Sequence, residues 1–241
     1  MQSAVETLIS VKDVSFVRER RTILSHINLD VNRGDFLAIT GPNGGGKTTL
    51  LRLMLKLLTP SAGKVIYHGD SKMFSIGYLP QKNMIDSSFP ITVRQVVESG
   101  LMFSKLTRQA QAGLVESTIE TIGLTNRADY PIARLSGGQL QRALLGRAII
   151  ASPRLLVMDE PLSYVDKNME QRIYDIIEKL TPETTIVLVS HEMSRIGQMA
   201  TRHIIIDETL TECHTRHHHF FDDCQAGPPS QTSPFNYRVN R

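Results

Sequence analysis

Apolar and polar residues follow different periods along this chain, and these periods predict its elements. Residues 8–14 and 27–31 alternate apolar and polar positions as half-buried β-strands do. Residues 36–40 and 155–158 are continuously apolar, which is typical of strands buried on both faces of a parallel sheet. Further strands are expected at 64–67, 75–79, 184–189 and 202–206.

Helical segments are expected between these strands. The segment 48–58 stops before Pro60, which cannot extend a helix, and 108–122 stops before Gly123, a residue suited to the position after a helix. The other expected helices are 92–101, 137–150, 167–180 and a short one from Glu192. Because the stretch from about 92 to 123 is helical alone, the pattern predicts a doubly wound α/β core with an inserted helical segment.

Composition excludes several classes of protein but does not indicate an activity. The 241 residues are 41% apolar and 21% charged, which excludes a fibrous or wholly disordered chain. A net charge of +3 is too mild to indicate a nucleic-acid partner, so none is expected. The apolar runs are too short to cross a bilayer, and residues 1–6 lack the pattern of a secretory signal. Two cysteines, both near the C-terminus, fit a reducing cytosol.

The last thirty-one residues differ from the rest in composition. Residues 211–241 hold four of the eight histidines, and Gly227-Pro228-Pro229 reads as unstructured linker. We therefore expect a globular domain over 1–210 and a flexible, His-rich tail over 211–241. Imidazole and thiolate are ligands for zinc and other first-row metals. One hypothesis is weak metal binding by the tail, and the other is a solvated tail without a role; the candidate ligands are Cys213, His214, His217, His218, His219 and Cys224.

A glycine-rich segment between the apolar run 36–40 and the helix after it fits the pattern G-x-x-x-x-G-K-[ST]. Glycines allow consecutive backbone N–H groups to face an anion, and the helix start adds its positive dipole. This indicates a phosphate-binding loop, in which Lys47 contacts the β- and γ-phosphates and the Thr48 hydroxyl ligates magnesium. The residues expected to bind the nucleotide here are Gly41, Pro42, Asn43, Gly44, Gly45, Gly46, Lys47, Thr48 and Thr49.

Two acidic residues follow the second buried strand. Asp159 and Glu160 come at the carboxyl end of the apolar run 155–158, where ligands bind in sheets of this kind. We expect Asp159 to hold magnesium, directly or through water, and Glu160 to accept a proton from an attacking water as general base. The fold class predicted is thus α/β, a P-loop NTPase (RecA-like) core with an antiparallel β edge and an inserted α-helical subdomain at about 86–150.

The segment 135–142, Leu-Ser-Gly-Gly-Gln-Leu-Gln-Arg, resembles the signature of ATP-binding cassette (ABC) ATPases. It follows Lys47 by about ninety residues, which leaves room for one small helical subdomain. The resemblance covers residues 8–206 and implies ATP and Mg²⁺ as cofactors. It also implies that hydrolysis requires a homodimer, in which this segment contacts the γ-phosphate held by the other protomer; the residues concerned are Ser136, Gly137, Gly138 and Gln139.

Further positions carry roles implied by the same resemblance. Gln81 matches the glutamine that reaches magnesium or the attacking water, and His191 matches the switch histidine that touches the γ-phosphate. Asp166 matches the residue near the dimer interface. One position departs from the family, because Arg18 stands where an aromatic residue usually stacks on adenine. A guanidinium can also stack on a base, so Arg18 is the expected contact, with Phe16 as the alternative.

Cargo and partners are implied by the resemblance alone. The three glycines of 44–46 and the segment 89–97 are similar to the bacterial zinc/manganese importer branch. This implies an ATPase on the cytoplasmic face of the membrane, bound to an integral permease and served by a metal-binding solute receptor. The alternative cargo is an iron-siderophore, haem or another solute.

Two other classes of P-loop protein fit the sequence less well. A chromosome or repair ATPase carries very long coiled coils between the two motifs, for which this spacing leaves no room. A P-loop kinase or nucleotide switch would lack the Ser136 motif and His191.

Overall fold

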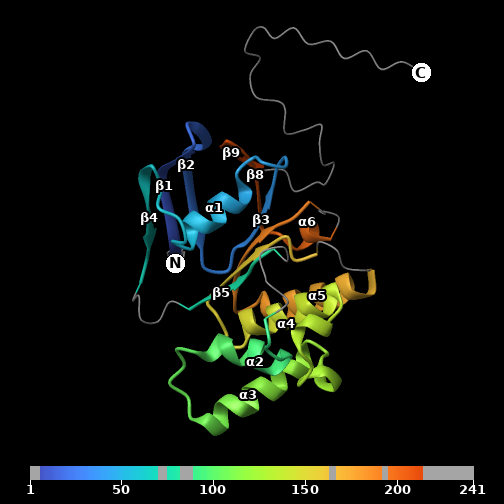
Figure 1. Cartoon of the computed structure of the whole chain (residues 1–241). Helices are drawn as coiled ribbons and strands as arrows, with labels where there is room; N and C mark the ends of the chain where they lie inside the picture. Colours follow the sequence, from blue (N-terminus) through green and yellow to red (C-terminus); the bar gives the residue numbers. More distant parts are fainter. Residues whose placement is uncertain (1–5, 70–74, 82–88, 163–166, 192–194, 214–241) are drawn as a thin grey trace, which may run out of the picture.

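The computed structural model describes residues 6–69, 75–81, 89–162, 167–191 and 195–213. The elements form two sheets and a group of helices (Figure 1). The smaller sheet has the strand order β2-β1-β4 and is antiparallel. The larger has the order β5-β6-β7-β3-β8-β9, with parallel pairing except where β9 runs antiparallel to β8. This is the P-loop core with an antiparallel β edge that the sequence predicts.

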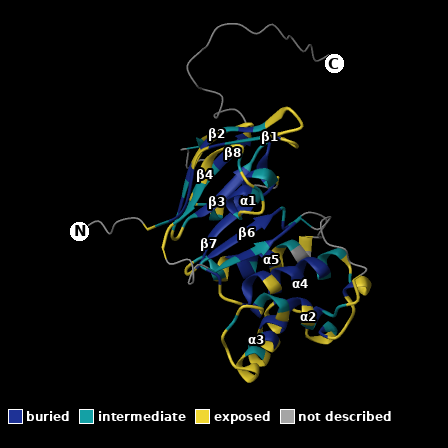
Figure 2. Cartoon of the chain, turned by 60° about the vertical axis from the view of Figure 1, so that its left-hand side comes forward, coloured by how far each residue is buried: buried dark blue, intermediate teal, exposed yellow. Residues whose placement is uncertain are grey.

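The strands of the larger sheet follow the apolar runs closely. Its members are β3 (Phe36–Thr40), β5 (Ile76–Leu79), β6 (Leu155–Asp159), β7 (Thr185–Val189), β8 (Arg202–Asp207) and β9 (Thr209–Cys213). Strands β6 and β7 are buried at every position, as expected for strands covered on both faces (Figure 2). Strand β9 was not predicted; it continues the regular structure to Cys213 through its pairing with β8.

The antiparallel sheet carries longer strands than the sequence pattern suggests. It consists of β1 (Thr7–Arg18), β2 (Arg21–Asn32) and β4 (Ala62–Tyr67). A two-residue turn joins β1 to β2, with Glu19 and Arg20 at φ of 51° and 64°. Positive φ at both turn residues matches the right-handed twist of the two strands. The apolar side chains of β1 and β2 pack with β3, β8 and the helix α1 (Lys47–Met54) in one core cluster.

The helices other than α1 lie on the other side of the larger sheet. The chain forms α2 (Val93–Glu98) with the 3₁₀ turn η2 (Ser99–Leu101), then α3 (Arg108–Thr121), η3 (Thr125–Arg127), η4 (Ile132–Arg134), α4 (Gly137–Ile149), α5 (Lys167–Leu180) and α6 (Ile196–Met199). Helices α2, α3 and α4 pack together and share one core cluster with the sheet. The outer face of α3 is exposed, so this group stands out from the core (Figure 2).

Two expected helices are shorter than predicted. Helix α1 ends at Met54 instead of residue 58, because Lys56 adopts a φ of 55° that a helix does not allow. The segment 92–101 divides into α2 and η2. Thr92 caps the start of α2 with a capping box. Its side chain accepts from the N–H of Gln95, and the Gln95 side chain accepts from the N–H of Thr92.

Candidate nucleotide site

The phosphate-binding loop joins the end of β3 to the start of α1. Gly41 and Gly46 adopt φ values of 134° and 101°, which side chains with a Cβ rarely allow. A Cβ on Gly41 would lie 2.0 Å from the carbonyl oxygen of Ile206, so β8 and the loop pack backbone to backbone. The loop is thereby held against the sheet with the first turn of α1 behind it.

Lys47 begins α1 and turns its side chain back over the loop. Its ammonium donates hydrogen bonds to the carbonyls of Gly41 and Pro42, at 2.9 and 2.8 Å. Burial lowers the pKa of Lys47, and the nearby carboxylates of Glu160 and Asp159 partly oppose that shift. A buried cation beside glycine N–H groups is suited to an anionic phosphate.

Thr48, in the first turn of α1, contacts Asp159, the last residue of β6. The Thr48 hydroxyl donates to Asp159 Oδ1 at 3.2 Å. Asp159 is fully buried, and within the described part of the chain its Oδ2 has no hydrogen-bond partner. Burial raises its pKa above the ordinary value of 3.8, although the bond from Thr48 opposes this. A hydroxyl beside an under-satisfied carboxylate is a donor set that fits Mg²⁺.

We expect Asp159→Asn to stabilise the protein without nucleotide while lowering magnesium-dependent turnover at least about tenfold. Because the folded-state pKa of Asp159 is raised, the wild-type chain loses stability as the pH rises from 3.8 through that pKa. The neutral asparagine removes this loss. Urea unfolding of both proteins between about pH 4 and 7 measures the difference. Parallel pH curves for the two proteins would contradict the burial cost assigned to this carboxylate.

Glu160, directly after β6, contacts two side chains that follow other strands. Gln81, directly after β5 and Pro80, donates from Nε2 to Glu160 Oε2 at 3.0 Å. His191, two residues after β7, places Nε2 3.1 Å from Glu160 Oε1. Glu160 itself has a φ of 51°, a conformation that costs energy in a residue with a side chain. The sequence-predicted Gln81, Glu160 and His191 therefore form one cluster.

The signature segment lies at the N-terminus of α4, among the helices. Ser136 caps this helix: its Oγ accepts from the N–H of Gln139 at 3.3 Å, and its own N–H donates to the Gln139 side chain at 3.0 Å. Gly137 and Gly138 form the first turn with Gln139. Ser136 is exposed, so the end of α4 faces outward.

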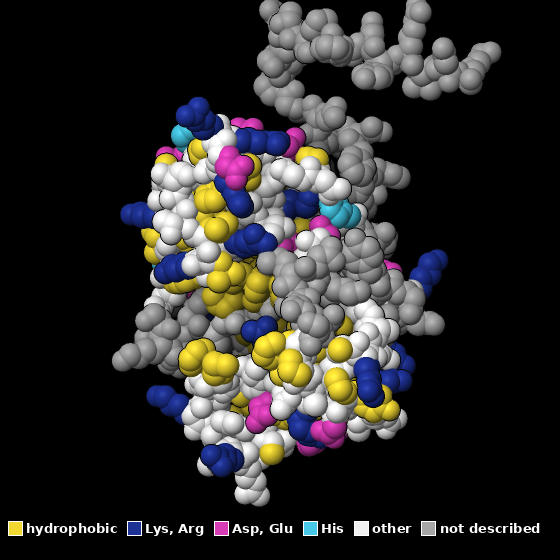
Figure 3. Space-filling view, viewed as in Figure 1, with side chains coloured by type: hydrophobic (Ala, Val, Ile, Leu, Met, Phe, Trp, Pro, Cys, Tyr) yellow, Lys and Arg dark blue, Asp and Glu magenta, His cyan; other side chains and the backbone are white. Residues whose placement is uncertain are grey.

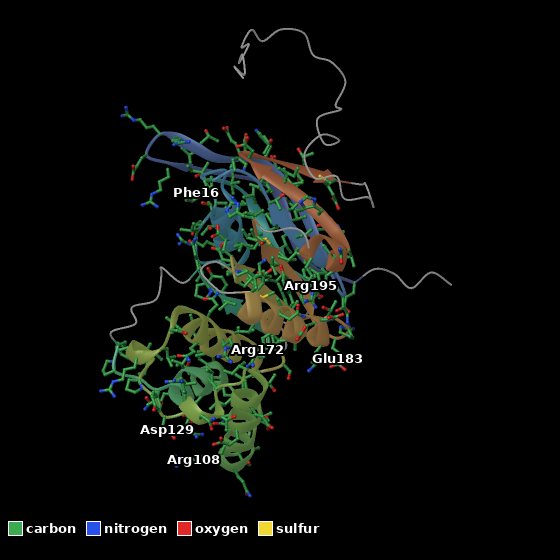
Figure 4. All side chains as sticks on the ribbon, turned by 90° about the vertical axis from the view of Figure 1, so that its right-hand side faces the viewer. Phe16, Arg108, Asp129, Arg172, Glu183 and Arg195 are labelled. Atoms are coloured by element: carbon green, nitrogen blue, oxygen red, sulfur yellow. The ribbon has the colours of Figure 1, made fainter. Side chains whose placement is uncertain are left out.

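The two candidates for the adenine contact lie at the β1–β2 hairpin. Arg18 is exposed and forms a loose ion pair with Glu19 at 3.7 Å. Phe16 is half-buried against the core cluster of the antiparallel sheet. Figure 4 places Phe16 at the opposite end of the molecule from Arg108 and Asp129 of the helical group. Arg18 thus has the more accessible side chain, and its contact with adenine stays a prediction.

Some predicted positions lie outside the described residues. They are Asp166 and the tail residues His214, His217, His218, His219 and Cys224. Cys213 is described: it is half-buried at the end of β9, opposite His203 of β8. Over residues 6–69, 75–81, 89–162, 167–191 and 195–213, no three His, Cys, Asp or Glu side chains form a metal-binding group.

An apolar cleft among the helices was not predicted from the sequence. It has a volume of about 280 Å³ and is lined by Phe89, Ile91, Val96, Ser99, Ile132, Leu144 and Arg147. Exposed apolar side chains also follow the 3₁₀ turn η2 in the chain: Phe103 is 94% exposed, and Met102 and Leu106 are exposed as well. Figure 3 shows apolar side chains gathered over the helical part of the molecule. In the sequence these apolar residues look like ordinary core positions. Only the exposure of Phe89 and Phe103 in the structure distinguishes them from core residues.

No helix in the part of the chain that the structure describes has the length and apolar character needed to span a bilayer. Of the helices that line the apolar cleft, α2 has six residues and α4 has thirteen.

Known proteins share both the sequence and the fold. The model of the ABC transporter family matches residues 24–163, more than half of the chain. The zinc import ATP-binding protein ZnuC of Pasteurella multocida is 36% identical over 228 residues, which cover 94% of this chain and 78% of that protein. A probable metal transport system ATP-binding protein of Chlamydia muridarum is 37% identical over 196 residues, 78% of this chain and 83% of that protein.

A solved ATP-binding cassette, a dimer in a post-hydrolysis state with ADP and Pi, superposes with a TM-score of 0.75. It is 24% identical, over 85% of this chain and 97% of its own, and so supports the fold. Together with the loop at Lys47 and the signature at Ser136, these matches establish that the chain belongs to the ABC transporter family, as one of its ATP-hydrolysing cassettes.

Proposed function

We propose that two copies of this chain enclose two ATP molecules, and that ATP binding and hydrolysis drive divalent-metal uptake, of zinc or manganese, through a membrane permease. The observation that carries the proposal is the joining of Gln81 and His191 to Glu160, beside the Thr48–Asp159 pair. Catalysis of phosphoryl transfer is mostly positioning and charge stabilisation, which such a preorganised cluster supplies.

The nucleotide-binding step depends on the loop and α1. Backbone N–H groups of 43–48 surround the phosphates, and the ammonium of Lys47 leaves its two carbonyl partners to contact the β- and γ-phosphates. Thr48 and Asp159 would hold Mg²⁺, with Gln81 as a further oxygen donor. Bound there, the ion neutralises charge on the β- and γ-phosphate oxygens. Arg18 stacks on the adenine in place of an aromatic ring.

The hydrolysis step depends on Glu160. A water oxygen attacks the γ-phosphorus, the bond to the β–γ bridging oxygen breaks, and a water proton passes to the Glu160 carboxylate. His191 and Gln81, each already hydrogen-bonded to that carboxylate, hold it in place and reach the γ-phosphate and the water. ADP and inorganic phosphate are the products.

The dimer supplies the remaining donors. The exposed Ser136 and the half-buried first turn of α4 present Ser136, Gly137, Gly138 and Gln139 to the γ-phosphate bound by the other protomer. Because this turn carries the positive end of a 13-residue helix, it favours an anion. Head-to-tail closure therefore completes each site with residues of the partner.

The permease would dock on the apolar cleft and the exposed side chains beside it. Phe89 and Leu144 line the cleft, and Phe103 and Met102 extend its apolar surface into solvent. Exposed apolar surface of this kind marks an interaction site. Phe89 of the cleft follows Gln81 by eight residues, so the proposed docking surface and the site are close in the sequence. Docking there places the chain on the cytoplasmic face of the membrane, with a solute receptor acting across the permease.

Zinc or manganese is the cargo favoured by the relatives, whose names include zinc import and metal transport. The alternative is an iron-siderophore, haem or another solute. The test is copurification of the chain with its permease, reconstitution into vesicles and uptake of radiolabelled zinc or manganese with ATP. Metal uptake that is lost in Glu160→Gln supports the proposal. Uptake of a haem or siderophore complex in place of the free metals would contradict zinc or manganese as the cargo and support the alternative.

A further inference from the structure

Gln141 is a buried polar side chain that the proposed mechanism leaves without a role. It lies in α4 and is 1% exposed. Both its amide atoms, Nε2 and Oε1, lack a hydrogen-bond partner among the residues that the structure describes. Buried amides are nearly always hydrogen-bonded, because leaving one unpaired costs free energy. In this arrangement the unpaired amide therefore costs free energy, which a shift of the neighbouring main chain into hydrogen-bond distance would recover.

The position of Gln141 follows from the packing of α4 on β5. The carbonyl of Ala148 lies so close to β5 that a Cβ on Gly77 would be 2.1 Å from it. Gln141 precedes Ala148 by two helical turns and lies on the same face of α4, about 10 Å nearer its N-terminus. Helix α4 packs along β5 (Figure 1).

The direction of the elements then identifies the neighbour. A short connection joins α4 to β6, so α4 runs opposite to β6 and to the parallel strand β5. Moving about 10 Å toward the start of α4 therefore means moving about three residues forward along β5 from Gly77. That step reaches Pro80 and Gln81, and Gln81 donates to Glu160.

We propose that Gln141 is a positioning residue for Gln81, and the proposal rests on the proposed function. When nucleotide draws the start of α4 toward the partner's γ-phosphate, the Gln141 amide hydrogen-bonds to the main chain at Pro80 and Gln81. The Gln81 side chain is thereby fixed against Glu160. Gln141 is the fifth residue after Ser136, so the helix carries the movement of its capped end directly to the strand end.

The test compares Gln141→Met with Leu145→Met, a control on the same face of α4. Gln141→Met replaces the amide with an apolar chain of similar length, so thermal stability should equal or exceed that of the wild type. We expect its kcat for ATP to fall about tenfold while KM changes less than twofold, because ATP binding itself does not involve the amide. Leu145→Met should keep wild-type values of both.

A double-mutant cycle with Gln81→Ala separates positioning from packing. If Gln141 acts through Gln81, the loss caused by Gln141→Met disappears in the Gln81→Ala background. Equal losses in both backgrounds, or wild-type kcat in Gln141→Met, would overturn the inference; Gln141→Leu provides the same cycle should the methionine variant not fold. Failure of the proposed function shows separately, as wild-type turnover no higher than that of Lys47→Ala.

Discussion

Glu160→Gln should lower ATP turnover at least about a hundredfold and leave ATP binding intact, since a positioned general base contributes about 10²–10⁴ in rate. The amide has the shape of the carboxylate but cannot take the proton of the attacking water. It still offers an oxygen to Gln81, whose Nε2 donates to Glu160 at 3.0 Å. The variant therefore retains the geometry of the site and loses its chemistry.

Two measurements check this expectation. Phosphate release gives the turnover, and size-exclusion chromatography with ATP shows the dimer, which should persist because the nucleotide is no longer consumed. The matched control is Glu183→Gln, since Glu183 is an exposed glutamate far from the nucleotide loop in the chain. Unchanged turnover in Glu160→Gln would overturn the general-base role. A variant with ATP that remains strictly monomeric would contradict the shared site.

Lys47→Ala should weaken ATP binding about a hundredfold, because hydrogen bonds to charged groups contribute about 1.5–3 kcal/mol. Lys47 is buried in the loop, and burial has already lowered its pKa by removing the ammonium from water. The phosphates replace that lost hydration. Without the ammonium, the loop keeps its N–H groups but has no cation of its own.

Titration calorimetry with ATP and Mg²⁺ measures the affinity. Lys64→Ala is the control, because Lys64 is an exposed lysine on β4 of the antiparallel sheet. Its removal lowers the net charge by the same amount while the loop stays whole. Equal affinities in Lys47→Ala and the wild type would exclude a phosphate role for this lysine.

The parts of the fold that were predicted are those with a strong local signal. The apolar strand 36–40 and the helix 167–180 have the predicted bounds, since one is covered on both faces and the other keeps a clear helical period. Strand β9 was missed because its five residues include three polar ones and depend on pairing with β8. Helix α1 ends early through the left-handed Lys56, which no propensity indicated.

Sequence motifs predict which residues form the candidate site, but they do not predict its geometry. Motifs identified Lys47, Thr48 and Asp159, and the structure places Thr48 against Asp159. The union of Gln81 and His191 on Glu160 depends on three strand ends that lie far apart in the sequence. No local sequence pattern predicts these contacts with Glu160, and only the resemblance to the family suggested them. The apolar cleft escaped prediction because burial there is decided by how four helical segments pack.

The side chain of Lys47 occupies the loop by bonding to the carbonyls of Gly41 and Pro42. Two backbone carbonyls thus compete with an incoming triphosphate for the ammonium of Lys47. If Lys47 contacts the phosphates as proposed, arriving nucleotide displaces these carbonyls, and the ammonium returns to them when ADP leaves. The cation would then keep hydrogen-bond partners both before nucleotide binds and after product is released.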